Sequence, residues 1–244
     1  MSIAEKLQTV AENQQRVYDS GQQAEYDRFW DAFQKNGTRG NYWYGFSGYG
    51  WAAEALKPKY KIAIIEDSRT VQYAVGMFYR CGGNDYNGNP NTCVDFSFIK
   101  DKFDFSGLKN ANSLFNSAYM INIDVDLSNA ETAEGAFARS WGGYLDNITL
   151  KVSEKLTNCP NMFLYGSTIT KLTFTEDSVI ACNGLDISAC TNLTHDSVMS
   201  IINALADKST DTSVNWAVTL GTANLAKLTD AEKAIATEKG WTLV

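Results

Sequence analysis

Large apolar residues recur at a regular interval along the middle of the chain, and each is followed three positions later by a small residue. The anchors Phe115, Phe137, Phe163 and Ile187 lie 22, 26 and 24 residues apart. This interval predicts an internal structural repeat. The copies read Phe115-x-x-Ala118-x-x-Ile121, Phe163-x-x-Gly166-x-x-Ile169 and Ile187-x-x-Cys190-x-x-Leu193, with partial copies at Phe137-x-x-Ser140 and Phe78-x-x-Cys81.

Short runs of alternating apolar and polar residues follow most copies, at 121–125, 148–152 and 169–174. Alternation with period two is typical of half-buried strands. One strand in about 24 residues is the length class of leucine-rich repeats, whose turns must stack because none buries its own apolar face. The pattern therefore predicts an α/β repeat, a leucine-rich-repeat-like solenoid over residues 61–193, with the phenylalanine anchors aligned inside it.

Residues 1–60 read as a separate N-terminal segment. Ser2 and Glu5 have the spacing of a helix capping box, and apolar residues recur at helical spacing up to about residue 35. Two interpretations of this helix stay open. It packs on its own domain, or residues 2–35 join copies of the chain into a homo-oligomer. Residues 36–60 are rich in glycine and aromatic residues and form a linker or a cap.

Residues 194–244 depart from the repeat and predict a C-terminal α/β cap. A helix is expected at 196–207, beginning near Asp196, and alternating residues from Val214 to Leu220 predict a strand. Thr229 and Glu232 form a second capping box, for a helix that runs to Lys239 and ends at Gly240. The last four residues would return as a strand.

The apolar-x-x-small-x-x-apolar rhythm, together with the fragment Gly135-Ala136-Phe137, resembles the BspA-like leucine-rich repeats of bacterial surface proteins. The stretches 2–7 and 24–30 are similar to leader segments on such proteins in gut bacteria and their prophages. The resemblance implies a binding or adhesion role on a cell surface or a phage-like particle. The chain lacks most of the family's leucines and its usual Ile-Pro turn.

The net charge limits the classes of partner that the chain is expected to bind. Twenty-eight acidic residues against 21 basic ones give a net charge of −7. Such a surface repels phosphates, so no nucleic-acid partner is expected. No apolar run is long enough for membrane insertion, and no signal peptide is visible, so the localisation stays unknown.

The cysteines and the lone histidine give little support for catalysis. Five cysteines without paired spacing argue against a disulfide framework. Cys81 and Cys190 occupy the small position of the repeat and are expected to be buried. His195, the only histidine, is expected to serve at the surface or in helix capping. No metal and no cofactor are expected.

These observations favour a non-catalytic recognition or adhesion module that binds a protein or a glycan on a surface. Two alternatives are a structural protein assembled through its N-terminal helix and a hydrolase that uses Asp124 and Asp126, which lie two apart on a predicted strand. The loop 141–144 is expected to carry two rings on a flexible backbone. The candidate binding residues are Tyr42, Trp43, Tyr44, Tyr49, Trp51, Trp141 and Tyr144.

Overall fold

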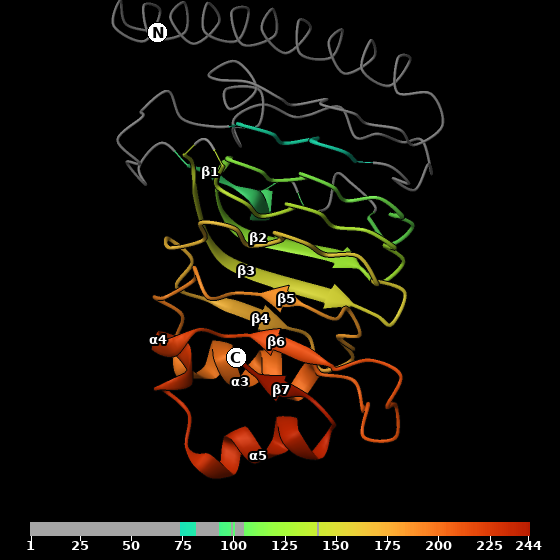
Figure 1. The fold of residues 1–244 in the computed structure, drawn as a ribbon. Coiled ribbons are helices and arrows are strands. Elements are labelled where there is room, and N and C mark those ends of the chain that lie inside the picture. Colours follow the sequence, from blue (N-terminus) through green and yellow to red (C-terminus); the bar gives the residue numbers. More distant parts are fainter. Residues whose placement is uncertain (1–73, 82–92, 99, 101–104, 141) are drawn as a thin grey trace, which may run out of the picture.

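The computed structural model describes residues 74–81, 93–98, 100, 105–140 and 142–244 (Figure 1). The predicted N-terminal helix lies outside these residues. In chain order the elements are β1 (Val94–Asp95), the 3-10 helix η2 (Phe96–Phe98), β2 (Tyr119–Leu127), β3 (Tyr144–Val152), β4 (Leu172–Phe174), β5 (Leu185–Asp186), α3 (His195–Ala204), β6 (Ala217–Thr219), α4 (Thr222–Leu225), α5 (Asp230–Glu238) and β7 (Thr242–Leu243).

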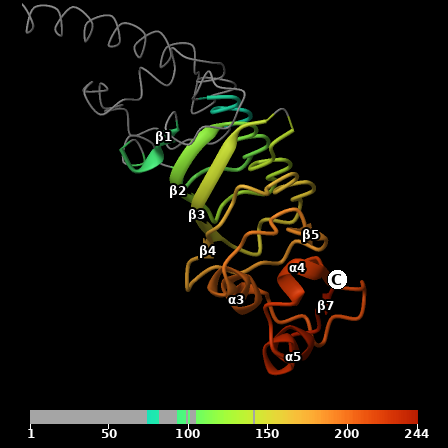
Figure 2. The same cartoon turned by 90° about the vertical axis from the view of Figure 1, so that its left-hand side faces the viewer.

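Strands β1 to β4 form one parallel sheet in chain order. The long strands β2 and β3, of nine residues each, are in register from Tyr119 opposite Tyr144 to Leu127 opposite Val152. Parallel strands need a connection that crosses back over the sheet. Between these strands the chain returns as a layer of turns on the far side of the core, as Figure 2 shows.

Backbone hydrogen bonds hold the layer of turns together in two alternating directions. The N–H groups of Ser113, Phe115 and Ser117 donate to carbonyls of residues 134, 136 and 138 in the next segment. Those of residues 114, 116 and 118 donate three residues back along the chain. Ser113 and Ser117 adopt positive φ angles of 55° and 59° to allow this alternation. The scheme satisfies the buried backbone without a helix.

Four phenylalanine rings stack between the sheet and the turns. The ring centroids of Phe78 and Phe115 lie 5.2 Å apart, and those of Phe137 lie 5.4 Å from both Phe115 and Phe163. All four side chains are fully buried. Stacked rings at this distance attract one another beyond the contribution of the apolar area that they bury.

Bulges in β2 and β3 shift the alternation of side chains by one position. Asn122 and Asn147 have φ angles of 55° and 50° and drop out of the strand pairing. The two positions face each other, so both strands bulge together and the register is unchanged: Ile121 pairs with Asp146 before them and Ile123 with Ile148 after them. As a result Met120 and Ile123, three positions apart, both enter the core, while Ile121 is only partly buried. The alternating run at 121–125 had predicted Ile121 on the core side.

Helix α3 closes the sheet beyond β4. The hydroxyl of Ser197 accepts a hydrogen bond from the N–H of Leu172 at 3.0 Å, and that of Ser200 accepts from the N–H of Phe174 at 2.7 Å. Ser197 and Ser200 are three apart and so share one side of the helix. They supply hydrogen-bond partners where a fifth strand would otherwise be needed, which protects the edge of the sheet.

The C-terminal segment forms a second parallel sheet, ordered β5-β6-β7, with α5 connecting β6 to β7. The predicted capping box of α5 is present, since Thr229 accepts from the N–H of Glu232 and Glu232 accepts from the N–H of Thr229. Gly240 follows the helix with a φ of 82°, as its predicted end requires. The strand expected at 214–220 is confined to residues 217–219.

The prediction of a leucine-rich-repeat-like solenoid is wrong. The described strands form two separate parallel sheets, of four and three strands, accompanied by three α-helices. The strand length is not kept along the chain, because β2 and β3 have nine residues, β4 has three, and β5 belongs to the second sheet. The physical cause is α3, whose serines take the place of the next strand. The described part of the chain is an α/β fold, and none of its helices has the length and apolarity needed to span a membrane.

Candidate functional site

The exposed face of the four-stranded sheet carries polar side chains in rows. Asp124 of β2 lies opposite Thr149 of β3, which lies opposite Thr173 of β4. In the next row Asp126 lies opposite Lys151. Their neighbours along each strand are buried, so these side chains point away from the core. We call Asp124, Asp126, Thr149, Lys151 and Thr173 the polar face.

The two bulges add a chain of hydrogen-bonded side chains beside the polar face. The amide of Asn147 donates to Oδ1 of Asn122, and the amide of Asn122 donates to Oδ2 of Asp95 at 2.9 Å. The other oxygen of Asp95 accepts from the N–H and hydroxyl of Ser97. These contacts fix the side chains before any ligand arrives, which lowers the entropy cost of binding.

Two ion pairs cross the face. Lys100 lies 3.1 Å from Asp124, and Lys151 contacts Asp177. The hydrogen bond that Lys151 donates to Asp177 raises the pKa of Lys151 and lowers the pKa of Asp177. Exposed pairs of this kind add little to stability. The charged side chains of both ion pairs can therefore exchange their partners for a ligand at a small cost in free energy.

Arg139 lies at the amino-terminal end of β3, where the turns meet the sheet. Its Nε donates to the carbonyl of Gly143 at 2.8 Å. Its Nη1 donates to the carbonyl of Tyr165 at 3.3 Å and to the hydroxyl of Ser167 at 3.1 Å. Burial lowers the pKa of this guanidinium. Arg139 thus holds together two segments that flank the start of the strand.

Gly143 passes close to the backbone of the preceding turn directly before β3. It has a φ of 100°, and a Cβ atom there would lie 2.6 Å from the carbonyl carbon of Ser117. The N–H of Tyr144 donates to the carbonyl of Ala118 at 2.9 Å. Only glycine therefore fits at position 143, and Tyr144 begins β3 directly after this close approach.

Tyr144 is the one predicted binding residue that the structure describes. It begins β3 and is partly exposed, and burial together with the charge of Asp146 raises the pKa of its phenol. Asp146 itself accepts hydrogen bonds from the backbone N–H and hydroxyl of Thr170. The remaining candidates lie outside the described residues: Tyr42, Trp43, Tyr44, Tyr49, Trp51 and Trp141.

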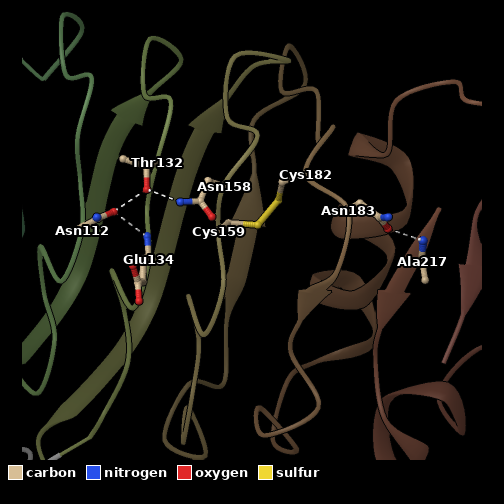
Figure 3. The surroundings of a disulfide bond; sticks show 8 residues. All are labelled: Asn112, Thr132, Glu134, Asn158, Cys159, Cys182, Asn183 and Ala217. Carbon is tan, nitrogen blue, oxygen red and sulfur yellow. Dashed lines mark hydrogen bonds between the residues drawn. A yellow bond between two sulfur atoms is a disulfide. The ribbon is translucent and has the colours of Figure 1, made fainter. Parts of the chain in front are cut away.

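The outer side of the turns carries a second polar ladder, shown in Figure 3. The hydroxyl of Thr132 donates to Asn112, and the amide of Asn158 donates to Thr132. Next to it lies an open hollow of about 360 Å³, bordered by Asn116, Glu134 and other polar residues. The ladder ties successive turns together, and the shallow hollow lies on the side of the molecule away from the polar face.

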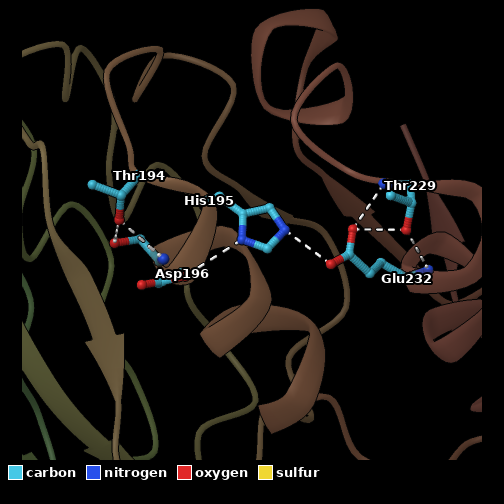
Figure 4. Close-up of polar contacts among 6 residues, drawn as sticks. Thr194, His195, Asp196, Thr229 and Glu232 are labelled. Atoms are coloured by element: carbon cyan, nitrogen blue, oxygen red, sulfur yellow. Dashed lines mark hydrogen bonds and ion pairs between the residues drawn. The ribbon is translucent and has the colours of Figure 1, made fainter.

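His195 connects the starts of two helices, as Figure 4 shows. Its Nε2 lies 2.9 Å from Glu232 of α5, and its Nδ1 lies 3.4 Å from Asp196. Hydrogen bonds to Asp196 and Glu232 raise the pKa of His195. The residue that caps α3 is Thr194, which accepts from the N–H of Ser197, so the helix begins at His195, one residue before the expected start near Asp196.

The two carboxylates considered for catalysis have separate partners. Asp124 contacts Lys100, whereas Asp126 accepts a hydrogen bond from the N–H of Ser128. Within the described ranges no group of three or more histidine, cysteine or acidic side chains could hold a metal ion.

The cysteines correct one prediction and confirm another. Cys159 and Cys182 form a disulfide with a Cα–Cα distance of 6.4 Å, which the odd number of cysteines had led us to exclude (Figure 3). Their separation of 23 residues matches the spacing of the phenylalanine anchors, and this match was the available signal. Cys81 and Cys190 are buried as expected, and burial raises the pKa of each thiol to about 12.

Comparison with models of protein families, with curated proteins and with solved structures finds no match. The resemblance to BspA-like proteins therefore stays a prediction. The function proposed below rests on the residues of this chain and their geometry.

Proposed function

We propose that this chain is a non-catalytic recognition module that binds a glycan through the polar face of its four-stranded sheet. The observation that carries the proposal is the row order of the polar face, with Asp124, Thr149 and Thr173 side by side on neighbouring strands. Neighbouring parallel strands lie about 4.8 Å apart, so the side chains within such a row are separated by about this distance. That spacing matches the size of one sugar ring, so neighbouring side chains of a row can contact successive hydroxyl groups.

The chemistry of the face favours a glycan over a protein partner. Asparagine and threonine side chains both donate and accept hydrogen bonds, as sugar hydroxyls do, and the carboxylates accept from hydroxyls. Protein interfaces depend on large apolar or aromatic anchors. Among the described residues the exposed large hydrophobic side chains are Tyr165, Val214 and Val244, none of which belongs to the polar face.

Rigidity of the site supports recognition rather than turnover. The Asp95–Asn122–Asn147 chain and the buried phenylalanine stack hold the face in one shape. Asp124 and Asp126 each have their own partner, which disfavours the hydrolase alternative. The resemblance to bacterial surface repeats supports a setting on a cell surface or a phage-like particle, where glycans are abundant.

The test is a binding screen on immobilised glycans with the full chain and two matched double variants. Asp124→Ala/Thr149→Ala removes one carboxylate and one hydroxyl from the polar face. Glu131→Ala/Thr157→Ala removes the same two groups from exposed positions in the turns that follow β2 and β3. Thermal melting of both variants checks that the fold is retained.

We expect the face variant to lose glycan binding by about tenfold or more, since two polar contacts of ordinary strength account for that factor. The control variant is expected to bind like the unaltered chain. Equal binding by both variants, or no binding by the unaltered chain to any glycan, contradicts the proposal.

A further inference from the structure

Arg139 is a partly buried cation whose described hydrogen bonds all go to neutral oxygen atoms. Its acceptors are the carbonyls of Gly143 and Tyr165 and the hydroxyl of Ser167. The ion pairs among the described residues leave Arg139 without an acidic partner. This is unusual in a chain with 28 acidic residues, because a charge removed from water is normally paired.

The contacts of Arg139 leave one end of its guanidinium unused. Nε and Nη1 donate to the protein, while Nη2 makes no hydrogen bond to the described residues. The three internal bonds fix the plane of the group. A fixed guanidinium with a free N–H₂ end is suited to an oxyanion, since hydrogen bonds between charged groups are about twice as strong as neutral ones.

Two tyrosines lie near this charge where the sheet begins. Tyr119 and Tyr144 lie opposite one another at the start of β2 and β3, and both lie near enough to act electrostatically on Arg139. Tyr165, whose carbonyl accepts from Arg139, is 59% exposed. An exposed tyrosine ring can pack on the apolar face of a sugar while a guanidinium binds its acidic group.

Arg139, Tyr144 and Tyr165 form a corner at the amino-terminal end of β3. This corner is continuous with the polar face. Along β3 the inward side chains are Leu145, Ile148 and Leu150, so Tyr144 and Thr149 point to the same exposed side. A glycan lying along the strand from Thr149 towards Tyr144 therefore reaches Arg139 at its end.

We infer that Arg139 and Tyr144 form a subsite for the carboxylate of an acidic sugar residue. The inference rests on the proposed glycan recognition and specifies its ligand class. An acidic peptide is the less favoured ligand, because the corner adjoins a face of hydroxyl, amide and carboxylate groups without an apolar pocket.

The experiment compares acidic glycans with neutral counterparts of the same sugar. The probes are oligogalacturonate against its methyl ester, and sialyllactose against lactose. Each is titrated into the full chain, into Arg139→Gln and into Arg139→Lys. Lys233→Gln is the matched control, because it removes a cation that lies on α5, outside the polar face, and is already paired with Asp230.

We expect the unaltered chain to bind at least one acidic probe about tenfold or more tightly than its neutral counterpart, as a charge-assisted contact predicts. Arg139→Gln is expected to abolish this preference while neutral binding persists. Arg139→Lys should keep part of it, and Lys233→Gln should keep it fully. A measurement independent of folding in the variants is the Nε–H resonance of Arg139 in the unaltered chain, which should shift with the acidic probe and not with its methyl ester.

The outcomes separate the two proposals. Binding of neutral and acidic probes with equal affinity overturns the inference and leaves the proposed function standing. Binding of neither overturns both. Retention of the acidic preference in Arg139→Gln, or its equal loss in Lys233→Gln, overturns the assignment of the carboxylate to Arg139.

Discussion

A Cβ atom on Gly166 would lie 2.6 Å from the Sγ atom of Cys190 and 2.9 Å from the carbonyl oxygen of Phe163. Both Gly166 and Cys190 are buried and follow a large anchor, Phe163 or Ile187, by three positions. The close approach explains why the sequence places small residues there. Two segments of the chain pass one another at this point, and no space remains for a methyl group.

Gly166→Ala is therefore expected to destabilise the fold by about 1–3 kcal/mol, the usual cost of inserting a methyl group into a packed core. Urea denaturation measures the change in the free energy of unfolding. Cys190→Ala in the same background removes the Sγ atom but not the Phe163 carbonyl. We expect the double variant to be less destabilised than the sum of the two single changes, and strict additivity would show that the two residues do not compete for space.

The disulfide between Cys159 and Cys182 closes a loop across 23 residues. A loop of this length predicts about 3 kcal/mol of stabilisation from the lost freedom of the unfolded chain. Cys159→Ala/Cys182→Ala should lower the melting temperature by about 6–12 °C for a chain of this size. Reductant should have a similar effect on the unaltered chain and none on the double variant. An unchanged melting curve under reductant would show that the bond does not form in solution.

The parts of the fold that the sequence predicts are those set by local chemistry. The spacing of Phe115, Phe137 and Phe163 predicts aligned rings, and the rings are stacked. The capping box at Thr229 and Glu232 and the glycine at 240 predict the start and end of α5 closely. In each case the residues of a short sequence pattern are sufficient to cause the observed structure.

The parts that sequence reasoning missed depend on contacts between distant segments. The helix after the repeat was expected, but nothing in the sequence pattern indicates that its serines would take the place of a strand at the edge of the sheet. Likewise Arg139 carries no motif. It becomes a candidate only when Gly143, Tyr165 and Ser167 are seen to gather around it. Of the predicted site, Tyr144 alone lies among the described residues.

The contact between His195 and Glu232 makes the stability of the C-terminal helices depend on pH. Hydrogen bonds to Asp196 and Glu232 raise the pKa of His195, so the folded state favours the charged ring. This contribution is fully present below the ordinary histidine pKa of 6.5 and is lost as the pH rises through the higher pKa of the folded state. We expect the difference in melting temperature between the unaltered chain and His195→Gln to be larger at pH 5.5 than at pH 8.5.

The pKa itself can be measured without ambiguity, because the chain has a single histidine. An NMR titration of the imidazole Hε1 resonance should give a pKa above 6.5. In Glu232→Gln the value should fall towards 6.5, since the closer of the two carboxylates is removed. A pKa that is the same in both proteins would mean that the contact is absent in solution.

Ser200 takes part in the closure of the sheet by α3. The hydroxyl of Ser200 accepts from the N–H of Phe174 and donates to its carbonyl, so it satisfies both polar groups of that residue on the outer side of β4. Ser200→Ala leaves them without partners, and an unsatisfied buried group costs about 1–3 kcal/mol. Amide hydrogen exchange at Phe174 should accelerate in this variant, while the amide of Leu172, which donates to the unaltered Ser197, serves as the internal control. If both amides accelerate equally, α3 has detached as a unit and the serine does not act locally. If neither changes, water replaces the hydroxyl, and the helix protects the edge by covering it rather than by hydrogen bonding.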